Sequence, residues 1–133
     1  MNKYTIASIM FFLSLPSFSA EWIAVGEQPE LSKTDEIEIR LWEYLKENSE
    51  SDFEPSENYR FQYKFISESK IFINALCVQA LNDESELGAL PGPTTEKLKN
   101  ELYLVLDGGN CFFNVKYNIE KAKFYSLSIN DRG

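Results

Sequence analysis

The chain of 133 residues contains no histidine. A Ser-His-Asp triad and a Cys-His pair are therefore excluded, because both depend on an imidazole that takes a proton from the nucleophile. Zinc and copper sites of the usual kind also lose their commonest nitrogen ligand. We therefore expect no metal site and no cofactor, and a binding function is favoured over an enzymatic one.

Basic residues are also scarce. Lysine and arginine together number 13 against 21 acidic residues, which gives a net charge of −8 at pH 7. An acidic domain repels a phosphate backbone, so we expect no nucleic-acid partner. Two interpretations of the acidity remain open: it steers a basic partner protein to the domain, or it keeps an exported domain soluble.

Long apolar runs are missing except at the N-terminus. There, Lys3 is followed by an apolar segment from Tyr4 to Leu15, by Pro16 and by small residues. This is the composition of a secretory signal peptide, and the apolar segment is shorter than the ~20 residues that span a bilayer. We therefore predict that the protein is periplasmic or secreted and that its mature form has no membrane span.

The cleavage point is predicted after Ser19, because Ser17 and Ser19 then occupy the two positions that require small residues. Cleavage after Ala20 is the alternative, although it places the bulky Phe18 at the outer position. We therefore expect the signal peptide to comprise residues 1–19, with a boundary at 19 or 20.

The predicted mature domain, residues 20–133, changes its apolar period once along the chain. A period of three and four residues predicts a helix over residues 33–48. A period of two, with many aromatic and β-branched residues, then predicts strands over residues 59–66, 71–78, 101–118 and 124–130. A chain of this length fits one α+β domain, with an N-terminal helix packed on a curved antiparallel sheet of four to five strands.

Gly108 and Gly109 interrupt the third predicted strand. They form either a bulge that bends one long strand over residues 101–118, or a tight turn between two strands. We favour the bulge, because a bent strand lets the sheet curve around the helix. Asp107 beside the glycines is interpreted as a residue that hydrogen-bonds its own loop rather than as a catalytic acid.

Cysteine occurs only at Cys77 and Cys111. In an exported protein a disulfide between them is the default, and two buried free thiols are the alternative. A bridge that closes a loop of ~34 residues stabilises the fold by about 4 kcal/mol in the chain-entropy model. We therefore expect a structural disulfide rather than a thiol nucleophile.

The strand register follows from letting the two cysteines face each other, since a slip of one residue would turn a strand's apolar face to water. Every pair on the resulting face is apolar. The predicted pairs are Ala75 with Phe113, Ile73 with Val115, Ile71 with Tyr117, Phe65 with Ile71, Phe61 with Ala75, Val115 with Leu127, and Phe113 with Ile129. We expect the helix to cover this face.

The opposite face of the sheet is the predicted binding face. Its rows combine apolar rings with amides and cations, which is the composition of a recognition surface. The predicted binding face consists of Arg60, Gln62, Lys64, Phe72, Asn74, Leu76, Phe112, Asn114 and Lys116, to which the last strand adds Ser126, Ser128 and Asn130. The alternative is that a loop or a second subunit covers these side chains.

The order of a helix, two strands, a long loop, a bent strand and a last strand resembles the cystatin-like group of folds, in which a curved antiparallel sheet wraps an N-terminal helix. The carboxyl half, from INALC through DGGNCFF and VKYN to LSIND, also resembles a family of small, uncharacterised exported bacterial proteins. That family ends in Asn-Gly after the last strand, where this chain has Asn130, Asp131 and Arg132. These resemblances imply no activity, because such scaffolds host inhibitors, enzymes and ligand binders alike.

Two functions of different classes follow. The first is an exported, non-catalytic binding protein of the inhibitor or immunity type, whose partner is another envelope or secreted protein. The second is a small-ligand-binding or enzymatic module with a pocket between helix and sheet, lined by Tyr63, Tyr117 and Asp107. A filled core favours the first function, and a deep cavity with convergent polar side chains favours the second. Composition defines neither the partner nor the oligomeric state.

Overall fold

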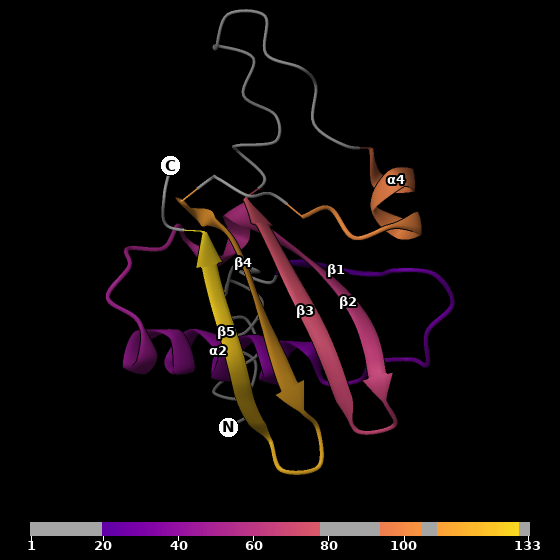
Figure 1. Cartoon of the computed structure of the whole chain (residues 1–133), viewed down its shortest axis with the longest axis horizontal. Helices are drawn as coiled ribbons and strands as arrows, with labels where there is room; N and C mark the ends of the chain where they lie inside the picture. The colour runs from indigo at the N-terminus through magenta and orange to yellow at the C-terminus, as the bar shows by residue number, and fades with distance from the viewer. Residues whose placement is uncertain (1–19, 78–93, 105–108, 131–133) are drawn as a thin grey trace, which may run out of the picture.

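The computed structural model describes residues 20–77, 94–104 and 109–130. Its elements are β1 (Glu21–Ala24), α2 (Thr34–Asn48), the 3-10 helix η1 (Ser56–Asn58), β2 (Tyr59–Ser67), β3 (Lys70–Cys77), α4 (Thr95–Asn100), β4 (Gly109–Asn118) and β5 (Lys123–Asn130). Helix α2 lies across one face of a five-stranded sheet (Figure 1). The predicted α+β class is confirmed at this level, and the predicted signal peptide lies outside the described residues.

Helix α2 forms where the sequence places apolar residues in one stripe. Ile37, Leu41 and Leu45 are buried in the main core, whereas Ile39 is 62 % exposed. Burial of each such aliphatic side chain contributes about 1.5–3 kcal/mol. The helix begins at Thr34, one residue after the predicted start.

The central strands pair in the predicted antiparallel register. The confirmed pairs are Phe61 with Ala75, Phe65 with Ile71, Ala75 with Phe113, Ile73 with Val115, Ile71 with Tyr117, and Phe113 with Ile129. Their side chains form the main core together with the apolar stripe of α2. The register was predictable because any slip would expose this continuous apolar face.

Strand β5 departs from the predicted register at one point. Asn114 faces Ser128, but Lys116 faces Tyr125, so β5 contains one extra residue between these pairs. Ser126 in this interval has a positive φ of 55°, which fits a β-bulge. The bulge brings Tyr125, rather than the predicted Ser126, into the row of Lys116. The predicted pair of Val115 with Leu127 falls within this shift and is not among the pairs of β4 and β5.

Strand β1 is absent from the predicted elements. It pairs in parallel with β2, with Trp22 opposite Phe61 and Ile23 opposite Gln62, so the sheet is mixed rather than antiparallel. Four residues are too few for a period of two to stand out. A parallel pair is joined through a long crossover, here containing α2, so no hairpin turn marks the strand in the sequence.

Strand β4 begins at Gly109, so the predicted strand over residues 101–118 is wrong in its first part. The described segment after α4 does not enter the sheet, because side chains of the sheet bind its backbone. Gln62 Nε2 donates to the carbonyl of Glu101, and Gln62 Oε1 accepts from the N–H of Tyr103. Of the predicted glycine bulge, Gly108 lies outside the described residues, and Gly109 is the first residue of β4.

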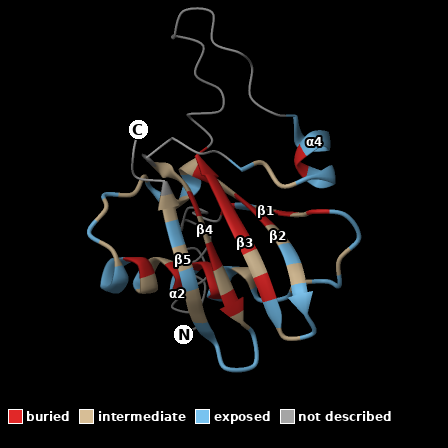
Figure 2. Cartoon of the chain, in the orientation of Figure 1, coloured by how far each residue is buried: buried red, intermediate tan, exposed pale blue. Residues whose placement is uncertain are grey.

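Burial is not restricted to one face of the sheet (Figure 2). The main core lies between α2 and the sheet, while a smaller cluster of Ile23, Leu76 and Leu98 lies on the other face, where α4 is placed. Strand β3 is therefore buried continuously from Ile73 to its end, whereas Lys70 at its start is exposed. This difference divides the predicted binding face into two parts.

Candidate functional site

The disulfide lies at the end of β3 and near the start of β4. The Cα atoms of Cys77 and Cys111 are 4.7 Å apart, within the range of about 4.4–6.8 Å for disulfides and close to the spacing of a non-hydrogen-bonded antiparallel pair. The structure brings the two sulfur atoms to bonding distance, as the register predicts, and leaves neither cysteine free. The pair therefore has a structural role and supplies no nucleophile.

Tyr59 closes the core at the same end of the sheet. It is 1 % exposed, and its hydroxyl donates to the carbonyl of Asn110 (3.0 Å) and accepts from the N–H of Glu54 (3.1 Å). Burial raises the pKa of Tyr59 from 10.0 to about 12, while the hydrogen bond from Glu54 opposes this by favouring the phenolate. Tyr59 is therefore a neutral structural residue rather than an acid–base group.

The covered part of the predicted binding face is held by side-chain amides. Gln62 has no exposed surface. Its Nε2 donates to the carbonyls of Leu98 and Glu101, each at 2.8 Å, and its Oε1 accepts from Asn74 Nδ2 and from the N–H of Tyr103, each at 2.9 Å. Asn74 Nδ2 also donates to the carbonyl of Tyr103 at 2.9 Å. Gln62 and Asn74 are therefore structural, and their predicted place on an exposed surface is wrong.

Apolar side chains cover the same part of the face. Leu76 is fully buried with Ile23 and Leu98, and Phe112 is partly buried against this cluster. The prediction of one exposed patch containing Phe72, Leu76 and Phe112 is therefore wrong for Leu76, because α4 supplies the cover. The alternative, that a loop covers part of the face, is correct for this half.

The edge of the covered part of the predicted binding face contains an ion pair between β1 and β2. Arg60 Nε lies 3.5 Å from Glu21 Oε1, a partly exposed pair worth about 0–1 kcal/mol. The N–H of Gly26 donates to the carbonyl of Lys99 at 2.7 Å, which ties the end of β1 to α4. An open hollow along this edge is lined by Glu21, Trp22, Ile23, Ala24, Gly26, Glu27, Lys99 and Asn100.

The other half of the face carries a row of alternating lysine and aromatic side chains. Lys64 on β2 faces Phe72 on β3, Phe72 faces Lys116 on β4, and Lys116 faces Tyr125 on β5. Lys64 is exposed and the other three are half-buried. The next row toward the hairpin turns adds two exposed lysines. We call this surface the open half-face. It consists of Lys64, Lys70, Phe72, Lys116, Lys123 and Tyr125 from these two rows, and of Asn114 from the neighbouring row.

The open half-face is cationic although the protein is acidic. The two rows contain four lysines and no carboxylate, their other polar members being Ser67 and Asn118. The whole chain has 21 acidic and 13 basic residues. A cluster of one charge sign raises the local concentration of groups of the opposite sign. This surface therefore suits an acidic partner.

Sequence reasoning identified four members of the open half-face, namely Lys64, Phe72, Asn114 and Lys116. It missed Tyr125, because the bulge in β5 reverses which side chains point away from α2. Lys70 and Lys123 each lie two residues before an aromatic member of the row, so extending the strand alternation to the hairpin ends would have found Lys70 directly.

The space between α2 and the sheet is filled by side chains. Leu41, Phe61 and Ile73 each have no exposed surface. Of the predicted pocket residues, Tyr117 is buried and contacts Phe124 with ring centroids 4.4 Å apart, and burial is the main cause that raises its pKa. Asp107 lies outside the described residues. The described part of the core therefore does not provide the predicted ligand pocket.

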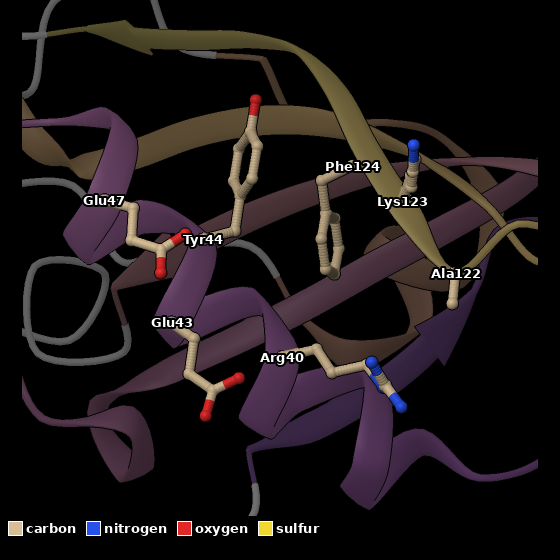
Figure 3. Close-up of a pocket in the computed structure, with 7 residues that line it drawn as sticks. All are labelled: Arg40, Glu43, Tyr44, Glu47, Ala122, Lys123 and Phe124. Carbon is tan, nitrogen blue, oxygen red and sulfur yellow. The ribbon is translucent and has the colours of Figure 1, made fainter.

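A second hollow lies where α2 meets the start of β5 (Figure 3). It is lined by Arg40, Glu43, Tyr44, Glu47, Ala122, Lys123 and Phe124. The rings of Tyr44 and Phe124 form its apolar wall, with centroids 5.3 Å apart. Its charged groups come from exposed positions and have both signs. The hollow is thus an open depression of mixed charge rather than an enclosed site.

Among the described residues, no group of three or more acidic or cysteine side chains is placed to hold a metal ion, and no helix is long and apolar enough to cross a membrane. Comparisons with protein-family models, curated proteins and solved structures found no match. The geometry defines the class as an α+β domain with one cationic, partly aromatic sheet face.

Proposed function

We propose that this protein is an exported, non-catalytic binding protein that recognises an acidic partner protein through its open half-face. The observation that carries the proposal is the alternating row Lys64, Phe72, Lys116 and Tyr125 across four strands. The filled space between α2 and the sheet favours this function over the small-ligand or enzymatic alternative.

The chemistry of the row suits protein recognition. Lysine ammonium groups accelerate encounter with an acidic surface and penalise basic competitors. Aromatic rings supply contact area with little rotamer entropy to lose, which is why they are enriched at the centres of interfaces. Because the row is built on four hydrogen-bonded strands, its side chains are held at fixed spacing before the partner arrives.

Export fits the same proposal. The predicted signal peptide over residues 1–19 would deliver the chain to the periplasm or the medium, where the Cys77–Cys111 pair can remain oxidised. An inhibitor or immunity protein of the envelope would act there on another exported protein. The cystatin-like fold is part of the proposal: α2 followed by β2 to β5 matches that order, while the parallel β1 departs from it.

Site-specific cross-linking tests the proposed surface. A photoreactive amino acid placed at Phe72 should capture one acidic envelope or secreted protein, and the same group at Ile39, exposed on α2, should not. The captured protein is then purified and its dissociation constant measured.

Charge reversal by K64E together with K116E should weaken binding at least tenfold, whereas reversal of the exposed Lys46 on α2 should leave it within twofold. Equal affinity for wild type and K64E/K116E would exclude the open half-face as the binding surface.

A further inference from the structure

We propose that hydrolysis of the Ser19–Ala20 peptide bond releases an α-amino group that Glu38 holds in a buried ion pair. The site combines the first described residue, Ala20, with a glutamate in the second turn of α2. The inference uses the predicted export and is independent of the open half-face.

Glu38 is unusual because it is a buried carboxylate, whereas the other acidic residues of α2, namely Asp35, Glu36, Glu43 and Glu47, are exposed. It is 5 % exposed. The backbone nitrogen of Ala20 lies 3.1 Å from Glu38 Oε1 and 3.0 Å from Oε2, so both oxygens face one nitrogen atom. Trp22 Nε1 donates to Oε1 at 3.2 Å, and the Ser56 hydroxyl donates to Oε2.

Among the described residues, this arrangement lacks a countercharge before cleavage. Within residues 20–77, 94–104 and 109–130, no lysine or arginine side chain forms an ion pair with Glu38; the ion pairs Arg60–Glu21 and Lys97–Glu101 involve other carboxylates. A buried carboxylate needs hydrogen bonds and an opposite charge to offset the loss of water. In the uncut chain, Ala20 provides one neutral N–H to two oxygens, so the best-placed donor carries no charge.

Cleavage converts that amide nitrogen into an amine. One water molecule is consumed, Ser19 leaves with a new carboxylate, and the Ala20 nitrogen becomes an amine that takes up a proton from solvent. The resulting ammonium has three N–H donors and a positive charge within reach of both Glu38 oxygens. Hydrogen bonds between an ammonium and a carboxylate are stronger than those between neutral groups. In the full chain, Ala20 is 7 % exposed and belongs to the main core.

The geometry also selects the cleavage position. Cleavage one residue later would make the exposed Glu21 the first residue and would remove the core contact of Ala20. The ion pair would join the start of β1 to α2, next to the Trp22 hydrogen bond. Processing at Ser19–Ala20 would therefore stabilise the edge strand β1, which has only four residues.

The first test is the mass of the protein recovered after export of the full chain. We expect a chain that begins at Ala20 with a free amino group. A product that begins elsewhere, or an uncut product, overturns the proposal. This result does not depend on whether a partner binds the open half-face.

The second test separates the charge from the hydrogen bond. The processed protein is acetylated on its α-amino group in denaturant, with the disulfide intact, and refolded beside a mock-treated sample. The acetyl carbonyl takes the place of the Ser19 carbonyl and keeps one N–H, so only the charge is lost. We expect the melting temperature to fall by about 5 °C or more.

In the E38Q variant, acetylation should shift the melting temperature by less than half as much, while the exposed-site control E43Q should respond like wild type. An unchanged melting temperature of the acetylated wild type, or an equal response of E38Q, overturns the ion pair.

Discussion

The side chain of Gln62 determines which part of the predicted binding face is accessible. Its amide binds two carbonyls, one N–H and the Asn74 amide, so the polypeptide after α4 lies on the sheet instead of pairing as a strand. Buried amide groups in folded proteins are nearly always hydrogen-bonded. Both the oxygen and the nitrogen of the Gln62 amide have partners. The residue therefore positions α4 and limits the accessible face to its other half.

Replacement of Gln62 by alanine tests this role. The change leaves the carbonyls of Leu98 and Glu101 and the N–H of Tyr103 without their present partner, so we expect the free energy of unfolding to fall by about 2–4 kcal/mol. Urea denaturation measures the loss, and S128A at an exposed position of β5 is the matched control. A loss no larger than that of S128A would contradict the network.

Tyr59 gives a prediction on pH. Its pKa in the folded protein is about 12, above the ordinary value of 10.0, so the folded state keeps the proton more tightly than the unfolded chain does. The corresponding stability, roughly 2–3 kcal/mol, is complete below pH ~10 and is lost as the pH rises from about 10 to 12.

Tyrosinate absorbance and unfolding at several pH values check this expectation. Wild type should show one tyrosine that titrates well above the rest, and Y59F should lack it and lose less stability over that pH range. Y125F on the open half-face is the control, because its side chain is only half-buried. Ionisation of every tyrosine near pH 10 would contradict the burial of Tyr59.

Among the elements, β3 is the central strand of the sheet. β3 pairs with β2 on one side and β4 on the other, and the disulfide joins β3 to β4 where β4 begins. The element between them in sequence, α4, packs on the far face from α2. The bridge therefore limits the freedom of the long connection that carries α4.

Removal of the disulfide should be costly. In the chain-entropy model, a loop of ~34 residues corresponds to about 4 kcal/mol, so the C77A/C111A variant should unfold at clearly lower denaturant concentration than the oxidised wild type. Reduction of the wild type should give a similar loss. Rapid alkylation of both cysteines in the native, unreduced protein would contradict the bridge.

The elements that could be predicted from sequence are those with a strong period. The 3.6-residue stripe of α2 and the two-residue alternation of β2, β3 and β5 gave their positions within a few residues, and the cysteines gave the register. β1 has four residues and a parallel partner, so it lacks both a visible period and a turn. The start of β4 was misplaced because the residues after α4 alternate like a strand, while tertiary hydrogen bonds from Gln62 and Asn74 hold them elsewhere.

The candidate site was predictable to the same extent. Alternation assigned Lys64, Phe72 and Lys116 to one face of the sheet, which the structure confirms. It could not show that α4 covers Leu76, because that contact joins segments far apart in the chain. It also could not reveal the bulge that brings Tyr125 into the row, because a single extra residue leaves no periodic signal.

At the scale of the whole molecule, charge is distributed unevenly. The net charge is −8, yet the two rows of the open half-face contain only cations among their charged residues. An acidic body with one cationic face orients an approaching acidic partner toward that face, because the rest of the surface repels it. We therefore expect association with the acidic partner that is fast and strongly dependent on salt.

The most direct measurement is the association rate constant with the cross-linked partner as a function of ionic strength. For wild type, the rate should fall at least tenfold between low and high salt, because the Debye length shrinks from ~30 Å at 0.01 M to ~3 Å at 1 M. For K64E/K116E, the rate at low salt should be at least tenfold lower and should not fall as salt is added. A wild-type rate that is insensitive to salt and equal to that of K64E/K116E would contradict recognition of an acidic partner by the open half-face.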